Sequence, residues 1–334
     1  MNLFKKVLKL FFKILLIFVL VILLAHFALV IFIKPSLDRD WNPDQTVLAR
    51  AEFSNSGNKN NENNGNNGSK KNNTDSSAPD LVTITNIRNI HYRSATDFDV
   101  AYYDKTFDLN KLNSVWYMVE PFSGYGAGAA HTLLSFGFKR GNGNQNNNQS
   151  DEFVAISVEI RKEKGESFSA VKGLARQYEL TYVIADERDV IKLRSNFRKD
   201  EVYLYPVKAS KEKMRELFVS MLNRANTLAV EPEFYNTLTN TCTTNIVSHV
   251  NEITSSRVPW SLKVLMPAYS DELAYKIGLI DNPTGLSLES LRKKYHINER
   301  AMRVDEQEKN DIGGTNVNAG MKGEDVGFSK RIRE

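Results

Sequence analysis

The stretch TLLSFGFKRGNGNQNNNQSDEFVAISVEIR, residues 132–161, is the part of the sequence that best predicts the fold. Its two ends, Thr132–Phe138 and Phe153–Arg161, are rich in β-branched and aromatic residues, a composition typical of strands. The Asn-rich run between them, Gly141–Asp151, suits an elongated hairpin loop. The two ends are therefore predicted to be antiparallel neighbours in a sheet.

Alternation along these strands assigns their side chains to two faces. One face is apolar and is expected to pack in the core; it consists of Leu134, Phe136, Phe138, Val154, Ile156, Val158 and Ile160. The opposite face is a largely polar stripe broken by Leu133, and it consists of His131, Ser135, Ser157, Glu159 and Arg161. A histidine, a carboxylate and a hydroxyl group are thus predicted to share one face.

Further segments of strand character flank this hairpin, namely Leu81–Tyr92, Ser114–Val119, Tyr178–Ile184 and Glu201–Val207. Two helices are predicted after the strands, Lys211–Ala229 with Ser210 as N-cap, and Thr243–Ile253 with Asn240 or Thr241 as N-cap. The first carries an apolar stripe of helical period, Met214, Leu217, Phe218, Met221, Leu222, Ala225 and Leu228, and the second the row Ile246, Val250 and Ile253. Strands followed by helices predict an α+β fold, an antiparallel sheet packed by helices.

The N-terminal region predicts a membrane anchor. Ile14–Ile33 is an apolar run, interrupted by His26, that can cross about 30 Å of hydrocarbon as a helix. Four lysines precede the run and charges of both signs follow it, so the N-terminus is expected in the cytoplasm and the main domain on the other side of the membrane. A cleaved signal peptide is the alternative, but its apolar region should be about 7 to 15 residues long with an Ala-x-Ala-like site, which Phe27–Ser36 lacks.

Composition divides the chain into four predicted parts. Residues 1–36 are expected to form a cytoplasmic stub and a single-pass membrane anchor. Residues 37–80 are expected to be an Asn-rich flexible tether, because Ser54–Asp80 contains no large apolar residue that could offset the entropy of ordering. Residues 81–300 are expected to form the exported domain, and residues 301–334, charged and rich in Gly and Asn, a disordered tail.

Overall composition excludes several classes of function. A net charge of +4 over 334 residues is too small to favour a nucleic-acid partner. The sequence has no P-loop, no Gly-x-Gly-x-x-Gly after a strand and no Cys or His pair at metal-ligand spacing, so neither a cofactor nor a metal is predicted. Cys242, the single cysteine, cannot form an internal disulfide. In an oxidising compartment it is expected to be either buried and inert or chemically used.

Cys242 lies four residues before Ile246, so it should point toward the sheet from the first turn of its helix. One interpretation is a small buried hydrophobic side chain. The other is a nucleophile, because the unpaired N–H groups and dipole of a helix N-terminus stabilise a thiolate. The position alone leaves both open.

A nucleophilic thiol needs a base within hydrogen-bond reach. His249 is seven residues along the same helix, about 10 Å from Cys242, and is therefore excluded as its direct partner. His296 lies near the tail, which leaves His91 and His131. His131 shares its stripe with Glu159, and a cross-strand acid that fixes the histidine tautomer would complete a Cys-His-acid arrangement. A solvated polar face of a half-exposed sheet is the alternative interpretation of that stripe.

Several stretches together resemble the Lnb N-terminal periplasmic domain family. They are NIRNIHYRS (86–94), AHTLLSFGF (130–138), FVAISVEIRKEKGESFSAVKGLARQYELTYVIADERD (153–189), LYPV (204–207) and EFYNTLTNTCTTNI (233–246). The resemblance covers about residues 80–255, and the order of the motifs, their spacing and their unusual residue combinations all agree with the family. It implies a circularly permuted papain-like or NlpC-like thiol enzyme, in which the His strand precedes the Cys helix. By the same resemblance His131 and Cys242 fall on the family's proposed catalytic pair, and Glu159 is a candidate for orienting His131, with Ser157 and Arg161 as alternatives on its stripe.

The resemblance also associates the family with N-acylation of bacterial lipoproteins, although Lnb-type acyltransferases carry further membrane spans after this domain, whereas here one span precedes it. The resemblance implies that the membrane is a bacterial inner membrane, with the N-terminus in the cytoplasm and residues 81–300 in the periplasm. The sequence thus favours an enzyme: a membrane-anchored, cysteine-dependent acyltransferase or hydrolase acting on a phospholipid, a lipoprotein or another envelope substrate. A peptidoglycan amidase or peptidase with the same catalytic pair is one alternative, and a non-catalytic envelope binding module is another.

Overall fold

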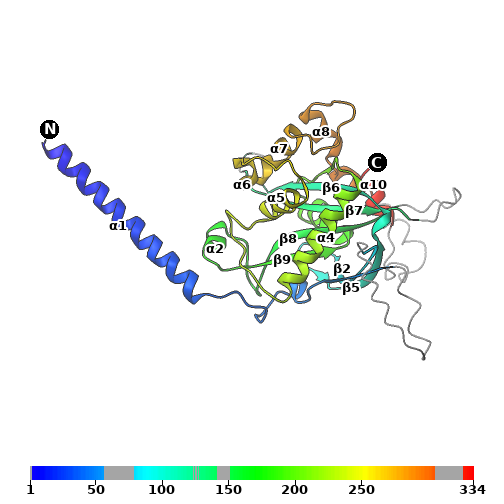
Figure 1. Cartoon of the computed structure of the whole chain (residues 1–334), viewed down its shortest axis with the longest axis horizontal. Coiled ribbons are helices and arrows are strands. Elements are labelled where there is room, and N and C mark those ends of the chain that lie inside the picture. Colours follow the sequence, from blue (N-terminus) through cyan, green and yellow to red (C-terminus); the bar gives the residue numbers. More distant parts are fainter. Residues whose placement is uncertain are drawn as a thin grey trace, which may run out of the picture.

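The computed structural model describes residues 2–55, 79–122, 124, 126, 128–140, 151–304 and 326–334. Helix α1 runs from Asn2 to Phe32 and projects away from the folded domain (Figure 1). Its part Phe4–Leu24 is long and apolar enough to cross a membrane, and none of that part is buried against the rest of the protein. Among the described residues it is the single helix that meets this condition.

A single large sheet organises the domain, in the strand order β1-β2-β9-β8-β7-β6-β10, with β5 also paired to β2. Its strands are β1 (Arg50–Ser54), β2 (Leu81–Arg88), β5 (Tyr102–Asp108), β6 (Leu112–Pro121), β7 (Ala130–Phe138), β8 (Glu152–Arg161), β9 (Glu179–Ala185) and β10 (Tyr203–Pro206). The pair β3 (His91–Tyr92) and β4 (Phe98–Asp99) forms a separate small sheet. All neighbours in the large sheet are antiparallel except β2 and β9, which are parallel where Arg88 faces Ala185, so the predicted antiparallel sheet needs this correction.

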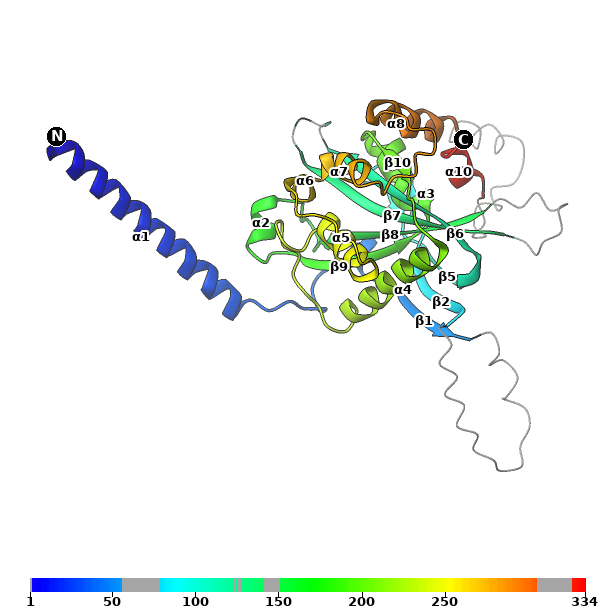
Figure 2. The ribbon, with the colours of Figure 1, turned by 45° about the horizontal axis from the view of Figure 1, so that its top comes forward.

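Helices cover both faces of the sheet, which makes the fold α+β as predicted (Figures 1 and 2). The α-helices of the domain are α2 (Ala170–Leu174), α3 (Glu187–Lys192), α4 (Lys211–Leu228), α5 (Cys242–Ile253), α6 (Leu262–Leu265), α7 (Ser270–Lys276), α8 (Leu288–Tyr295) and α10 (Val326–Arg331). Shorter turns are η1 (Pro43–Gln45), η3 (Leu109–Lys111), η5 (Leu193–Arg198) and η6 (Pro267–Tyr269). One apolar core lies between the sheet and α4 and α5, and a second lies under α3, residues 298–304 and α10.

The central hairpin and the two main helices confirm the sequence-based predictions. β7 pairs antiparallel with β8, and Leu134 faces Ile156 across the pair. Every residue of the predicted α4 stripe is buried, and Ser210 caps that helix by accepting a hydrogen bond from the Lys213 N–H. Of the two candidate caps for α5, the structure uses Thr241. These elements were predictable because local sequence pattern and tertiary packing agree.

The alternative interpretation of the polar stripe, a solvated face of a half-exposed sheet, is wrong, because the face opposite α4 and α5 is also buried. Leu133 and Ala155 belong to the second core, and Ser135 hydrogen-bonds to the carboxylate of Glu187 from α3. Arg161, at 4% exposure, donates to the carbonyl oxygens of Gln45 and Thr46. The polar side chains of this stripe are therefore hydrogen-bonded in the interior rather than hydrated.

The predicted tether over residues 37–80 is wrong in its first part. β1 pairs with β2 along its whole length, with Ala51 facing Ile84. Trp41 is 7% exposed and stacks beneath the guanidinium group of Arg161, 4.1 Å from the ring centroid. Apolar side chains outside the obvious strand patterns thus extend the folded domain back to residue 36. The remaining predicted tether (residues 56–78), most of the predicted hairpin loop (141–150) and the side chain of His26 lie outside the described residues.

The predicted disordered tail is wrong at its C-terminal end. Phe328 on α10 and Ile332, just after the end of that helix, are fully buried in the second core. Arg333 donates hydrogen bonds to the buried carboxylate of Glu187 and packs over the ring of Phe153, 3.6 Å from its centroid. The short amphipathic segment 326–334 thus packs on the domain although a polar stretch of sequence precedes it. The stretch 305–325 lies outside the described residues.

This contact predicts that the last residues stabilise the domain. Phe328→Ala should lower the free energy of unfolding by about 3 kcal/mol, because it removes a fully buried aromatic ring. Lys330→Ala on the same helix, whose side chain is 59% exposed, should change it by less than about 0.5 kcal/mol. Thermal unfolding of the detergent-solubilised chain, followed by circular dichroism, measures both. Equal melting temperatures for the two variants would contradict the packing of α10.

Candidate functional site

One pocket lies at the end of the sheet where β7 begins, β6 and β8 end, and α5 begins. It encloses about 740 Å³, part of it open to solvent. Its lining is Glu120, Phe122, Ala130, His131, Val158, Glu159, Ile160, Lys162, Phe168, Arg194, Arg198, Tyr235 and Cys242. The structure therefore brings the three site residues predicted from the sequence, Cys242, His131 and Glu159, to one pocket.

Cys242 is the first residue of α5 and is 6% exposed. The helix starts here because Thr241 and Thr244 form a capping box, in which each side chain accepts a hydrogen bond from the other residue's backbone N–H. This arrangement occupies the N–H groups of Thr241 and Thr244. No hydrogen bond between described residues involves the N–H of Cys242 or Thr243. Two backbone donors thus remain available beside the thiol at the positive end of the helix dipole.

His131 is held by a hydrogen-bond chain on the other side of the pocket. Its Nε2 lies 2.7 Å from the Ser157 hydroxyl, which donates to Glu159 Oε1 at 2.8 Å. Because the serine proton points to the carboxylate, Nε2 must carry the proton that binds Ser157, and Nδ1 keeps a free lone pair. No described residue hydrogen-bonds to Nδ1, and the side chain is 11% exposed. His131 therefore presents an unprotonated nitrogen at the pocket.

The carboxylate of Glu159 acts on His131 mainly through Ser157, since its Oε1 is 3.8 Å from Nε2. Among the candidate orienting residues, Ser157 makes the direct contact and Glu159 fixes Ser157. Arg161 is directed away, to the carbonyl groups of residues 45 and 46. Ser157 and Glu159 therefore together hold His131, whereas the sequence interpretation favoured Glu159 alone.

A buried arginine, Arg194, links Glu159 to a second carboxylate. Its Nη2 donates to Glu159 Oε1 at 3.0 Å and its Nε donates to Glu120 Oε2 at 2.6 Å. Arg194 is held in place by the π-helical turn η5, and it also donates to the carbonyl oxygen of Val190. Glu120 is fully buried, and its Oε1 has no hydrogen-bond partner among the described residues.

Burial and Arg194 set the protonation states of this network. Burial, reinforced by the positive charge of Arg194, lowers the pKa of His131 to about 3, so the imidazole is neutral at pH 7. Burial alone would raise the pKa of Glu159, but Arg194 and His131 hold it well below its usual range. Burial raises the pKa of Glu120 to about 7, although Arg194 acts in the opposite direction. Glu159 is therefore the charged partner of Arg194, and Glu120 can hold a proton.

Cys242 and His131 share the pocket but are not hydrogen-bonded to each other. Cys242 belongs to the core on the α5 side of the sheet, whereas His131 points to the opposite side, next to Ser157 and Glu159. Among the described residues, the polar contact of the thiol is with Thr243 Oγ1, at 3.8 Å. Both side chains border the pocket at the end of the sheet where β7 begins.

The remaining described histidines are explained by structural roles. His249 is 4% exposed, and its ring nitrogens bind the hydroxyls of Tyr182 and Ser220 at 2.8 and 2.7 Å. His91 is exposed on the small sheet. His296 pairs with Glu201 at 2.6 Å. Of the described histidines, only His131 lines the pocket that contains Cys242.

Sequence reasoning missed Glu120 and Arg194. Glu120 faces His131 directly across the β6–β7 pair, but the predicted strand stopped at Val119, so the register that reveals this neighbour was incomplete. Arg194 lies in η5, which has no periodic pattern to place it. Within the described residues no group of three or more His, Cys, Asp or Glu side chains could hold a metal ion.

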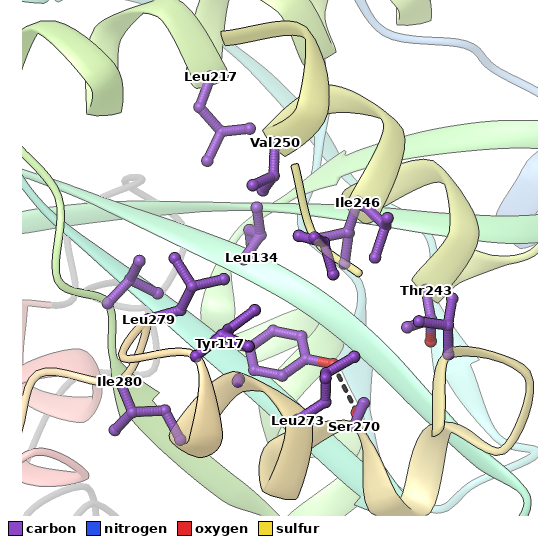
Figure 3. A pocket seen from close by; sticks show the side chains of 16 residues that line it. Tyr117, Leu134, Leu217, Thr243, Ile246, Val250, Ser270, Leu273, Leu279 and Ile280 are labelled. Carbon is purple, nitrogen blue, oxygen red and sulfur yellow. Dashed lines mark hydrogen bonds between the residues drawn. The ribbon is translucent and has the colours of Figure 1, made fainter. Parts of the chain in front are cut away.

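A second pocket is almost wholly apolar, and Thr243, the residue after Cys242, is part of its lining (Figure 3). Leu134 and Tyr117 of the sheet form its floor, and α5 contributes Thr243, Ile246 and Val250. The segment around α7 forms the facing wall, and the Tyr117 hydroxyl donates to Ser270 at 2.7 Å across it. It encloses about 670 Å³, part of which is open solvent.

The fold and this site define a class of protein: an α+β domain behind one apolar helix, with a buried cysteine at a helix N-terminus and a neutral histidine in a common pocket. Residues 99–268, about half of the chain, match the profile of the Lnb N-terminal periplasmic domain family, and the chain belongs to that family. Neither a curated protein nor a solved structure matches the chain. The family and helix α1 fit a membrane-anchored protein with a periplasmic domain.

Proposed function

We propose that this protein is a cysteine-dependent acyltransferase or hydrolase acting on lipid-linked substrates of the bacterial envelope. The observation that carries the proposal is the common pocket, in which Cys242 begins a helix with two unpaired N–H groups and His131 presents an unprotonated nitrogen. The order of the histidine strand β7 before the cysteine helix α5 supports a circularly permuted papain-like arrangement. The lysines at positions 5, 6, 9 and 13 support a cytoplasmic N-terminus in the inner membrane.

In the first half-reaction, His131 Nδ1 takes the thiol proton and the sulfur of Cys242 attacks the carbonyl carbon of an acyl ester. The backbone N–H groups of Cys242 and Thr243 stabilise the oxyanion of the tetrahedral intermediate. The C–O bond then breaks, and the leaving alkoxide takes the proton from His131. The products are a thioester on Cys242 and a free alcohol.

In the second half-reaction, an amine or a water molecule attacks the thioester. His131 takes a proton from the nucleophile, the C–S bond breaks, and the proton returns to sulfur. An amide or a carboxylic acid is released. General-base catalysis is favoured over a resting thiolate–imidazolium pair, because burial and Arg194 disfavour a charged His131 by lowering its pKa.

The apolar pocket supports an acyl donor with a hydrocarbon chain. Cys242 lines the polar pocket and Thr243, the next residue, lines the apolar one, so an acyl group on sulfur can place its chain between α5 and α7. Burial of methylene groups there is favourable by about 0.8 kcal/mol each. A peptidoglycan peptide would leave such a pocket unfilled.

Mass spectrometry of the full-length protein tests this proposal. Incubation with phospholipid vesicles should add the mass of one fatty acyl group to Cys242, and neutral hydroxylamine should remove it because the bond is a thioester. Peptidoglycan fragments serve as the comparison donor. Modification of Cys242 by those fragments and not by lipid would favour the amidase or peptidase alternative. No adduct with either donor would support a binding module.

A further inference from the structure

The connection between α1 and the domain is short. α1 ends at Phe32, and Ser36 already donates its backbone N–H to Glu179 Oε1 at 3.0 Å. The guanidinium Nε of Arg39 donates to the same oxygen at 2.7 Å. A chain spans at most about 3.6 Å per residue, so Ser36 lies within roughly 14 Å of the end of α1. Since the interfacial layer of a bilayer is itself several ångströms thick, the domain is held against the membrane that α1 enters.

The point of attachment defines which end of the domain faces the membrane. Glu179 is the first residue of β9, and β8 ends at Arg161, so the β8–β9 connection that contains α2 lies at that end. The start of β7 lies there as well, and the carbonyl of Gly128 before it accepts a hydrogen bond from the Ala268 N–H after α6. Figures 1 and 2 both show α2 and α6 on the side of the domain nearest α1.

The same end exposes large apolar side chains. Around α6, Trp260 is 83% exposed and Leu262 59%, and around α2, Phe168 is 50% and Val171 73% exposed. Most other large apolar residues of the described domain are buried, so these side chains are concentrated rather than scattered. Lys172 lies beside Val171 on α2 and is exposed. Exposed Trp and Leu next to Lys are typical of a surface that enters the interfacial layer of a bilayer.

We propose that this α2–α6 surface, consisting of Phe168, Val171, Trp260 and Leu262, docks on the phospholipid bilayer in which α1 is embedded. Docking does not depend on the chemistry proposed above. If that chemistry holds, docking places the pocket mouth at the lipid, because Phe168 and the part-exposed Phe122 line the pocket of Cys242. An acyl donor then reaches the thiol from the bilayer without crossing water.

A single-site fluorescence label tests the docking. Because Cys242 is the only cysteine, Cys242→Ala with Trp260→Cys gives a full-length chain with one thiol for the polarity-sensitive dye NBD. The matched control carries Lys213→Cys instead. Lys213 is 43% exposed and lies at the opposite end of the sheet, since the first turns of α4 contact Asn110 just before β6. In nanodiscs of phosphatidylethanolamine and phosphatidylglycerol, the label at 260 should emit at shorter wavelength and be quenched by doxyl lipids, whereas the label at 213 should show neither effect.

A label at 260 that is as polar and as unquenched as the label at 213 would overturn the proposal. Intrinsic fluorescence gives a second measurement that needs no label. Trp116 is partly buried and Trp41, at 7% exposure, is buried but lies near the attachment of α1, so quenching of the wild-type chain by brominated lipids should fall clearly in Trp260→Tyr while the part that arises from Trp41 remains. Unchanged quenching in Trp260→Tyr would also contradict docking. Neither readout requires enzymatic activity, so failure of the acyl-transfer proposal is distinguishable from failure of docking.

Discussion

Cys242→Ala is expected to give a folded protein whose acyl-transfer or hydrolytic activity is reduced by about 10⁴-fold or more, the loss typical of removing a covalent nucleophile. Cys242→Ser should be equally inactive, because a hydroxyl is a much weaker nucleophile than a thiol beside a neutral histidine. Both substitutions keep the side chain small, and the side chain is 6% exposed, so Cys242→Ala should cost only about 1 to 2 kcal/mol of stability. Activity and thermal unfolding are measured on the same preparations.

A substitution in the same core controls for the loss of stability. Leu222→Val on α4 removes one methylene from a fully buried side chain that lines neither pocket, and should cost about 1 kcal/mol. This variant should remain active, which would show that a loss of this size is not itself inactivating. If Cys242→Ala is folded and still active, the thiol mechanism is wrong and Cys242 is a buried hydrophobic residue.

The elements that could be predicted from the sequence are those with a regular hydrophobic period, because such a period fits either a helix or a strand and not both. The α4 stripe and the β7–β8 hairpin have regular periods, and both were found with bounds close to those observed. β1 and α10 were missed because their sequences, short and flanked by polar runs, resemble loop or tail. Tertiary contacts decide their structure: Ala51 pairs with Ile84 in the sheet, and Phe328 fills the second core. Local propensity carries no information about such partners.

The candidate site also has features that the sequence predicted and features that only the tertiary structure shows. The strand period placed His131, Ser157 and Glu159 on one face, and the structure joins them in one hydrogen-bond chain. The position of Cys242 at a helix start followed from the cap before it. The sequence could not show that the cysteine and the histidine approach the pocket from opposite faces of the sheet, because that depends on where α5 crosses β7. Arg194, which sets the charge of the network, depends equally on tertiary structure.

His131→Ala is expected to abolish activity, by about 10³-fold or more, while leaving the fold intact. The side chain borders a pocket, and its one hydrogen-bond partner, Ser157, keeps its bond to Glu159 after the ring is removed. His91→Ala, at an exposed position, is the matched control and should change neither activity nor stability. His249→Ala should lower stability instead, because it leaves Tyr182 and Ser220 without their shared partner. A folded His131→Ala variant with wild-type activity would exclude His131 as the base.

The pH dependence of kcat/KM separates this buried histidine from an ordinary one. The base must be neutral, and an ordinary histidine becomes protonated as the pH falls through about 6.5. Because burial and then the charge of Arg194 lower the pKa of His131 to about 3, protonation of His131 should not lower the rate between pH 7 and pH 5, and Glu120→Gln, which removes the other group that titrates there, should show a flat profile. The free energy of unfolding, in contrast, should change over this pH range. Below about pH 6.5 the unfolded chain binds a proton at His131 that the folded chain excludes, so the free energy of unfolding falls progressively toward pH 3. His131→Ala should remove that part of the acid destabilisation, whereas His91→Ala should retain it. An acid limb near pH 6.5 that persists in His91→Ala, His249→Ala and Glu120→Gln would show that the base titrates as an ordinary histidine and that Arg194 does not control its charge.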